Sequence, residues 1–129
     1  MMIFLVEDSP DIRDRLRILI SEVAGADVVA EADNQEDAVR GIFETQPDVV
    51  IMDLHLASGT GMEVLRQVKT KQPAIQVVML TNHAYPQYRK RCIELGADYF
   101  LDKSRDIGLL GDLLADLANG VCLYKKCIG

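Results

Sequence analysis

The sequence has few basic residues and no nucleotide-binding motif. Its 14 lysines and arginines are outnumbered by 20 aspartates and glutamates, which gives a formal net charge of -6. Because no long basic run offsets this charge, we expect no direct binding of nucleic acid, whose phosphate backbone attracts cationic surfaces. Neither GxxxxGK[ST] nor GxGxxG occurs, which argues against nucleotide sites of those types. The charge favours a protein partner or a cation.

Long apolar runs are also absent. No stretch approaches the ~20 apolar residues of a transmembrane helix. The N-terminal segment "MMIFLVEDSP" becomes acidic after six residues, which is not the pattern of a secretory signal. We therefore predict a cytoplasmic location without insertion into a membrane.

Cysteine is scarce, and the few cysteines lack the spacing of metal ligands. Reduced thiols at Cys92, Cys122 and Cys127 are the simplest interpretation, with a disulfide between Cys122 and Cys127 as the alternative. No repeat or low-complexity segment is present, and 129 residues is close to the commonest size of one domain. We therefore expect a single domain.

Short apolar runs alternate along the chain with longer amphipathic segments, which predicts strands alternating with helices. The five predicted strands are "IFLV" from residue 3, "DVVAEA" from 27, "DVVIMD" from 48, "IQVVMLT" from 75 and "DYFLDK" from 98. Helical spacing relates three sets of residues: Ile12, Leu16, Leu19 and Val23; Tyr88, Cys92 and Leu95; and Leu110, Leu113, Leu114 and Leu117. Residues that commonly begin or end helices flank these segments. Ser9 and Asn34 are the predicted N-caps, and Gly25, Gly96 and Gly120 are the predicted C-terminal stops.

Strands this apolar, separated by helices, predict a doubly wound α/β domain with a parallel sheet covered on both faces. In such a sheet, ligands bind outside the carboxyl ends of the strands. The residues found there are Glu7 and Asp8 after the first strand, Asp53 after the third, Thr81 at the end of the fourth and Lys103 after the fifth.

These strand-end residues are expected to converge and to need a cation. Two carboxylates ~4 Å apart repel by roughly 4 kcal/mol at an effective dielectric of ~20, and Lys103 supplies one positive charge for three acids. Mg²⁺ suits carboxylate oxygens, and a carboxylate beside a cation, a hydroxyl and an ammonium suits phosphoryl transfer onto Asp53. Taken singly, each residue has an ordinary explanation as a helix cap, a β-former or a surface lysine. These separate explanations do not account for all of the residues standing at the same end of their strands.

The motifs "VEDSP", "DVVIMDLHLASGTGMEVL", "VVMLT" and "GADYFLDKS" resemble the receiver domain of two-component response regulators, from Ile3 to about Ala118. The resemblance implies a flavodoxin-like (βα)5 fold with strand order 2-1-3-4-5. It implies a receiver domain over residues 1–119 and a C-terminal tail over 120–129, without a separate output domain. In this interpretation the chain is no enzyme beyond catalysing its own phosphorylation and dephosphorylation.

The resemblance also assigns roles to individual residues. Asp53 is implied to accept phosphate from a histidine kinase or a histidine phosphotransfer protein. Glu7, Asp8 and Asp53 would hold Mg²⁺ together with the backbone carbonyl of His55. The remaining implied roles are those of Lys103, which pairs with phosphoryl oxygens, of Thr81, whose hydroxyl moves toward them, and of Phe100, the aromatic switch residue that turns inward when Thr81 moves.

Some positions depart from the usual pattern of the family. Ala57 replaces a common proline, which is expected to leave the loop after Asp53 freer. Asn82 is larger than the usual residue and is expected to narrow access to the phosphoryl group. We hypothesise that His55 and His83 flank Asp53 and set the lifetime of the phosphate by positioning or blocking the attacking water.

Several functions stay open on sequence alone. The receiver is expected to act on an unknown protein target, to form a homodimer or to shuttle phosphate in a relay; a pseudo-receiver that only docks is the rival without chemistry. A haloacid-dehalogenase-like phosphohydrolase would need an acid where His55 stands. A flavodoxin would need a phosphate-binding first loop, whereas "EDSPD" repels phosphate.

Overall fold

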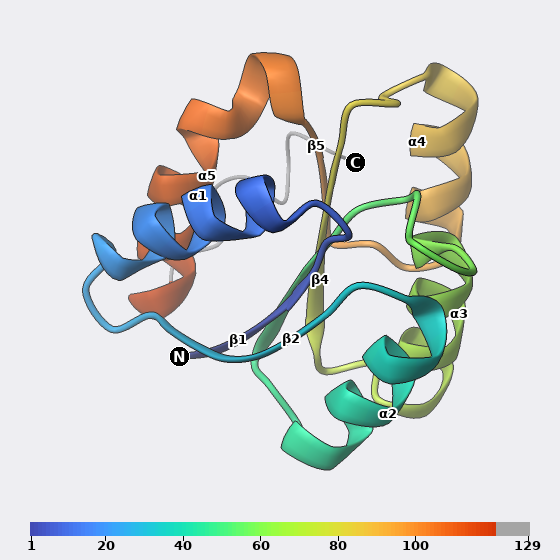
Figure 1. The fold of residues 1–129 in the computed structure, drawn as a ribbon, viewed down its shortest axis with the longest axis horizontal. Coiled ribbons are helices and arrows are strands. Elements are labelled where there is room, and N and C mark those ends of the chain that lie inside the picture. The colour runs from blue at the N-terminus through green and yellow to red at the C-terminus, as the bar shows by residue number, and fades with distance from the viewer. Residues whose placement is uncertain (121–129) are drawn as a thin grey trace.

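The apolar runs of the chain form one parallel sheet of five strands in the order β2-β1-β3-β4-β5 (Figure 1). The computed structural model describes residues 1–120. Its strands are β1 (Met2–Val6), β2 (Asp27–Ala32), β3 (Val49–Met52), β4 (Gln76–Thr81) and β5 (Tyr99–Asp102). This confirms the predicted doubly wound fold and its strand order.

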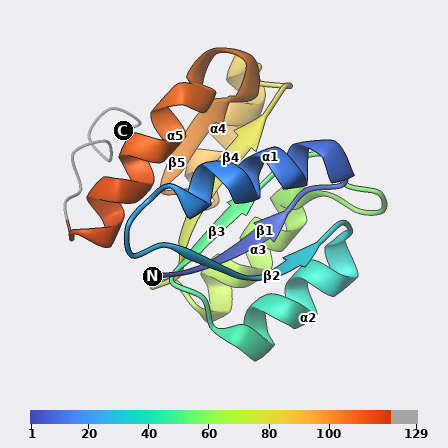
Figure 2. The ribbon, with the colours of Figure 1, turned by 60° about the vertical axis from the view of Figure 1, so that its left-hand side comes forward.

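A helix follows each strand, as parallel strands require. The helices are α1 (Pro10–Ser21), α2 (Gln35–Thr45), α3 (Gly61–Lys71), α4 (Pro86–Glu94) and α5 (Lys103–Ala118). Figures 1 and 2 show α1 and α5 on one face of the sheet and α2, α3 and α4 on the other. None of the helices within residues 1–120 is both long and apolar enough to cross a lipid bilayer.

Alternation of side chains along the strands divides the core into two apolar clusters. On β1, Ile3 and Leu5 pack under α1 and α5, whereas Phe4 and Val6 pack under the other three helices. The central strand β3 is buried on both faces over its whole length. Its four apolar residues therefore fix the position of the acid that follows them.

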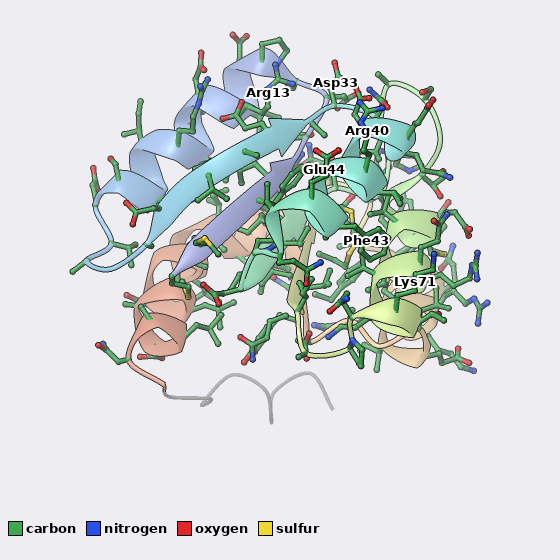
Figure 3. The ribbon with its side chains drawn as sticks, turned by 90° about the horizontal axis from the view of Figure 1, so that it is seen from below. Arg13, Asp33, Arg40, Phe43, Glu44 and Lys71 are labelled. Atoms are coloured by element: carbon green, nitrogen blue, oxygen red, sulfur yellow. The ribbon has the colours of Figure 1, made fainter. Side chains whose placement is uncertain are left out.

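Contacts between helices also hold the outer layer together. Figure 3 shows Phe43 of α2 near Lys71 of α3, and the Lys71 ammonium lies 5.5 Å from the centroid of the Phe43 ring. This distance is typical of a cation–π contact. It joins the two helices that flank the loop following β3.

Most of the predicted helix ends are where the sequence placed them. Ser9 and Asn34 accept hydrogen bonds from the backbone of Ile12 and Asp37, at 3.4 and 2.9 Å. Gly96 and Gly120 follow the C-caps of α4 and α5 with φ of 104° and 77°. Both glycines use the left-handed conformation that commonly ends a helix.

The end of α1 differs from the prediction. The helix stops at Ser21, so Val23 lies beyond the helical face to which it was assigned, and Gly25 lies in the turn before β2. The reason is local: the Val23 amide donates to the Ile20 carbonyl at 2.9 Å, a tighter bond that takes the chain out of the helix. Val23 still packs on the apolar cluster beneath α1.

Of the three cysteines predicted to be reduced thiols, the described residues include Cys92. Cys92 is a buried free thiol, and burial raises the pKa of this thiol to about 11. It is therefore protonated near neutral pH. The proposed disulfide of Cys122 with Cys127, and all of the predicted tail after Gly120, lie outside the described residues.

Candidate functional site

The carboxyl ends of β1, β3 and β4 bring the predicted acids and Thr81 to one edge of the sheet. Val6 pairs with Met52, and Met52 with Met79, so Glu7 and Asp53 leave the sheet side by side. The ladder continues for one more bond, because the Asp53 amide donates to the Val6 carbonyl at 3.0 Å. Backbone pairing therefore sets the position of both acids.

Lys103 joins the two buried acids. This first residue of α5 donates from Nζ to Asp53 Oδ2 at 2.7 Å and also to Glu7 Oε1. The three side chains are almost completely withdrawn from water, with Glu7 2%, Asp53 9% and Lys103 9% exposed. The second oxygen of Asp53 accepts the Leu54 amide at 2.6 Å, so both of its oxygens are held. The result is an oriented carboxylate beside one fixed positive charge.

Electrostatics show that one lysine does not balance this site. Burial raises the pKa of Glu7 above its usual value, and the lowering effect of Lys103 offsets that only in part. Burial alone would lower the pKa of Lys103, but its hydrogen bonds to Asp53 and Glu7 outweigh this and raise it. Lys103 therefore stays positively charged at neutral pH, while burial still disfavours the charged form of Glu7.

The acidic cluster has the geometry of a cation site. Glu7, Asp8 and Asp53 each offer a carboxylate oxygen, and these atoms lie within 4.8 Å of one another. Asp8 is exposed, which leaves the cluster open to solvent on that side. An all-carboxylate donor set suits a hard cation, since soft metals prefer thiolate or imidazole. The residues present therefore fit a hard divalent ion such as Mg²⁺.

Thr81 and Phe100 lie behind this edge, both buried. The hydroxyl of Thr81 accepts the His83 amide at 3.0 Å. Phe100 is 2% exposed, and the Arg89 guanidinium lies 5.7 Å from its ring centroid and donates to its carbonyl at 3.2 Å. The switch hypothesis has Phe100 turn inward on phosphorylation, but in this structure it already lies inward, with Arg89 covering it.

The two histidines meet above the edge of the sheet. The rings of His55 and His83 have centroids 4.2 Å apart and are inclined by 78°, in an edge-to-face contact. The ring centroid of Tyr88 of α4 lies 6.3 Å from that of His55. Both imidazoles are exposed. The predicted tuning pair is therefore in mutual contact, on the loops after β3 and β4.

Asn82 lies toward the other side of the site. It lines a hollow of about 360 Å³ between α1 and α5, together with Lys103. The rest of the lining is mainly apolar, from Ile12, Leu16, Leu19 and Ile107. Asn82 is thus brought close to Lys103 but belongs to a different wall of the site from the histidines.

The loop between β3 and α3 (residues 54–60, the β3–α3 loop) corrects one expectation. Ala57 was expected to leave it freer than proline would, but the Ala57 amide donates to the Asp33 carbonyl at 2.9 Å. Proline has no amide hydrogen and would lose this bond. Alanine at this position therefore allows the loop to be tied to the segment before α2.

Gly61 is a residue of the site that the sequence analysis missed. A Cβ added there would lie 1.9 Å from the Asp53 carbonyl oxygen, so only glycine lets α3 begin so close to the acid. Its amide donates to the Leu54 carbonyl at 2.9 Å. The only signal in the sequence was a glycine shortly after Asp53, which by itself indicates no more than a turn.

Comparison with known proteins agrees with this geometry. A family model described as the response regulator receiver domain matches residues 3–115. Among curated relatives, the transcriptional regulatory protein DesR of Bacillus subtilis (strain 168) is 30% identical over 122 residues, which are 95% of this chain and 60% of the relative. The response regulator protein VraR of Staphylococcus saprophyticus is 27% identical over 95% of this chain and 59% of its own length. The chain thus spans about three fifths of these relatives.

Solved structures give the same result. The crystal structure of a two-component response regulator of the LuxR family from Aurantimonas sp. SI85-9A1 matches with a TM-score of 0.85 and 33% identity, over 93% of this chain and 86% of that chain. A DNA-binding response regulator of the LuxR family from Staphylococcus aureus matches with a TM-score of 0.83 and 29% identity, over 92% and 98%. The backbone of the described residues therefore follows that of these proteins closely.

Proposed function

The chain belongs to the family of response regulator receiver domains, and from this premise we propose that Asp53 accepts a phosphoryl group from a phosphohistidine. The donor is a sensor histidine kinase or a histidine phosphotransfer protein, and we place the reaction in the cytoplasm. One observation carries the proposal: the Asp53 carboxylate is held at the end of the central strand, 2.7 Å from the Lys103 ammonium. A purely structural ion pair would not need two further carboxylates, those of Glu7 and Asp8, with oxygens within 4.8 Å of one another and of Asp53 and with Asp8 exposed to solvent.

The reaction uses groups that are already in place. An oxygen of Asp53 attacks phosphorus; an O–P bond forms as the N–P bond breaks, and the electron pair of that bond leaves with the donor imidazole. Lys103 then faces the phosphoryl oxygens and stabilises their charge. The chain modifies its own Asp53 and acts on no separate substrate, so it is not proposed as an enzyme in the usual sense.

The cation of this site is proposed to be Mg²⁺. Glu7, Asp8 and Asp53 would hold it with the backbone carbonyl of His55, which adds an oxygen donor from the β3–α3 loop. The support is the 4.8 Å grouping of the three carboxylates and the charge excess that Lys103 leaves. When bound, the ion supplies positive charge that screens the acids and the incoming phosphoryl oxygens.

Phosphorylation would be transmitted by charge. A phosphoryl group brings about -1.5 to -2 charges and new acceptor oxygens to the edge of the sheet. The Thr81 hydroxyl, now bonded to the His83 amide, would turn toward those oxygens, and the packing around Phe100 would change. The altered surface of α4, β5 and α5 is the proposed binding surface for a target protein or a second copy of the chain.

The decisive experiment is direct phosphorylation of the whole chain. With Mg²⁺ and acetyl phosphate, intact mass spectrometry should show one added phosphoryl group, and Asp53→Asn should show none. Asp11→Asn, which changes an exposed acid at the start of α1, is the matched control and should be phosphorylated like the parent. No adduct, or an adduct that persists in Asp53→Asn, would contradict the proposal and favour a docking module without chemistry.

Two roles of the phosphorylated chain remain distinct proposals. Output through a target is favoured by the relatives, which are named as transcriptional regulators. A relay would instead pass the phosphoryl group back to a histidine of another protein. The phosphorylated chain can be mixed with a histidine phosphotransfer protein and the intact mass of both proteins measured. Movement of the phosphoryl group to the phosphotransfer protein indicates a relay, and its retention on the chain indicates output through a target.

A further inference from the structure

The β3–α3 loop is bonded along its length to the segment that enters α2. The Ala57 amide donates to the Asp33 carbonyl, and the Gln35 amide donates to the Ser58 carbonyl, both at 2.9 Å. The side chain of Gln35 adds a third bond, because its Oε1 accepts the Thr60 amide at 3.0 Å. Figure 3 shows Asp33 where β2 passes toward α2, beside this loop. A loop after a buried strand is thus fastened to a helix outside the site.

The Gln35 side chain also packs closely against the backbone of Gly59. Gly59 has φ of +74°, and a Cβ built on it would lie 2.3 Å from Gln35 Oε1 and 2.4 Å from Gln35 Cβ. The Gln35 side chain therefore occupies the space next to the bare backbone of Gly59. Any side chain at position 59 would both strain the backbone and displace Gln35. This close fit distinguishes the contact from a loose surface hydrogen bond.

Gln35 is connected to the cation site through Thr60. Thr60 forms an isolated antiparallel bridge with His55, whose carbonyl is the proposed backbone ligand of Mg²⁺. The segment that carries Gln35 also reaches the other side of the site, because the Ala32 carbonyl accepts the Glu7 amide at 3.0 Å. The strand end before Gln35 thus fixes one acid, and Gln35 fixes the loop opposite it.

We infer that Gln35 is a positioning residue for the cation site. It acts through Thr60 and the β3–α3 loop and holds the His55 carbonyl where the cation needs it. A ligand on a loop that is already ordered loses less conformational entropy when the cation binds, so the affinity is higher. Glutamine does this with a neutral acceptor and adds no charge to an already acidic edge. The inference rests on the proposed function, since it needs a cation at the acids.

The test is a titration of the full chain with Mg²⁺, without a phosphoryl donor. Backbone amide NMR signals report binding and give the dissociation constant. Gln35→Met keeps the length of the side chain and removes the acceptor, and the dissociation constant should rise about fivefold, as expected for one lost hydrogen bond that orders a ligand. Gln35→Glu keeps an acceptor oxygen and adds a negative charge, so it should bind Mg²⁺ at least as tightly as the parent. Gln67→Met is the matched control, because Gln67 lines the same hollow beside α2 but bonds Glu63 rather than the loop.

A second measurement, made without metal, tests the clamp itself. The Thr60 amide should exchange with solvent faster in Gln35→Met than in the parent and be unchanged in Gln67→Met. Faster exchange with unaltered Mg²⁺ affinity would overturn the inference, as would an equal loss of affinity in Gln67→Met. If the parent chain bound no Mg²⁺, the proposed cation site would fail, and this inference with it; a loss of affinity confined to the missing acceptor supports both.

Discussion

The site has two halves that differ in burial and in the structure that supports them. The buried half lies at the strand ends and at the start of α5, and consists of Glu7, Asp53, Thr81 and Lys103. The exposed half lies on the connecting loops, and consists of Asp8, His55, Asn82 and His83. Backbone pairing within the sheet places the two acids of the buried half, whereas hydrogen bonds to the segment that enters α2 hold the β3–α3 loop, which carries His55 of the exposed half.

This difference separates two kinds of consequence. Charges in the buried half have lost most of their hydration, so a change there alters the free energy of unfolding as well as the chemistry. Side chains in the exposed half remain hydrated, so a change there should alter reaction rates with little effect on folding. Under the proposed function, the core would keep Asp53 in place while the loops would set how long the phosphate stays on it.

The largest effect on stability is expected from removing Lys103, the positively charged residue of the buried half. Lys103→Met leaves the buried carboxylates of Glu7 and Asp53 without their cationic partner, and the free energy of unfolding at neutral pH, without metal, should fall by about 3 kcal/mol. Added Mg²⁺ should recover part of this loss. Lys90→Met, which removes an exposed lysine of α4, should change stability by less than about 0.5 kcal/mol. Urea unfolding measures both, and equal effects would show that burial does not distinguish the two lysines.

The next effect concerns the glycine that lets α3 approach Asp53. Gly61→Ala puts a Cβ against the Asp53 carbonyl oxygen, so the start of α3 must shift, and stability should fall by roughly 2–3 kcal/mol. The same change at Gly108 of α5 meets no atom within 4 Å and should raise stability by about 0.5–1 kcal/mol through helix propensity. Thermal unfolding with opposite signs for the two variants is the expected result. A shared sign would refute the close contact.

A smaller loss of stability is expected at the β3–α3 loop. Ala57→Pro removes the amide that donates to Asp33, and the free energy of unfolding should fall by about 1 kcal/mol. Ala57→Ser retains the amide and should match the parent in the same urea titration. If the proline variant were as stable as the serine variant, the loop would not depend on this bond.

The smallest effect on folding, with a clear effect on chemistry, is expected at the two histidines. His55→Ala and His83→Ala should each change the lifetime of the phosphate by about threefold or more, roughly 0.6 kcal/mol of activation free energy, because the tuning hypothesis has the imidazoles flank Asp53 and position or block the attacking water. Loss of phosphoryl group is followed by intact mass after removal of the donor. Ser104→Ala, at an exposed position after Lys103, is the comparison variant. Lifetimes equal to the parent in both histidine variants would remove the tuning hypothesis.

Local patterns in the sequence were sufficient for the doubly wound fold class and for the residues of the buried half, whereas the strand order came from the resemblance to receiver domains. Four apolar residues before Asp53 predict a central strand. Four apolar residues also precede Glu7, and the strand-like run "YFLD" precedes Lys103, which predicts that these side chains meet at one edge. The inference holds because strand periodicity is local and because parallel strands align their carboxyl ends. The end of α1 was misplaced, because the amides of Glu22 and Val23 donate to carbonyls only three residues back and so end the helix earlier than the apolar spacing predicts.

Contacts between loops could not be derived in this way. The approach of His55 to His83 and the bond from Thr60 to Gln35 join residues from different connections, and Phe100 of β5 is covered by Arg89 of α4. No pattern along the chain records these contacts. The two glycines that matter most, Gly59 and Gly61, appeared only as turn residues until their neighbours were in place. The sequence by itself determined which groups end the strands, because burial of apolar runs is encoded locally. Only the tertiary structure decided how the loops hold those groups, because that depends on which side chains folding brings within a few ångströms of one another.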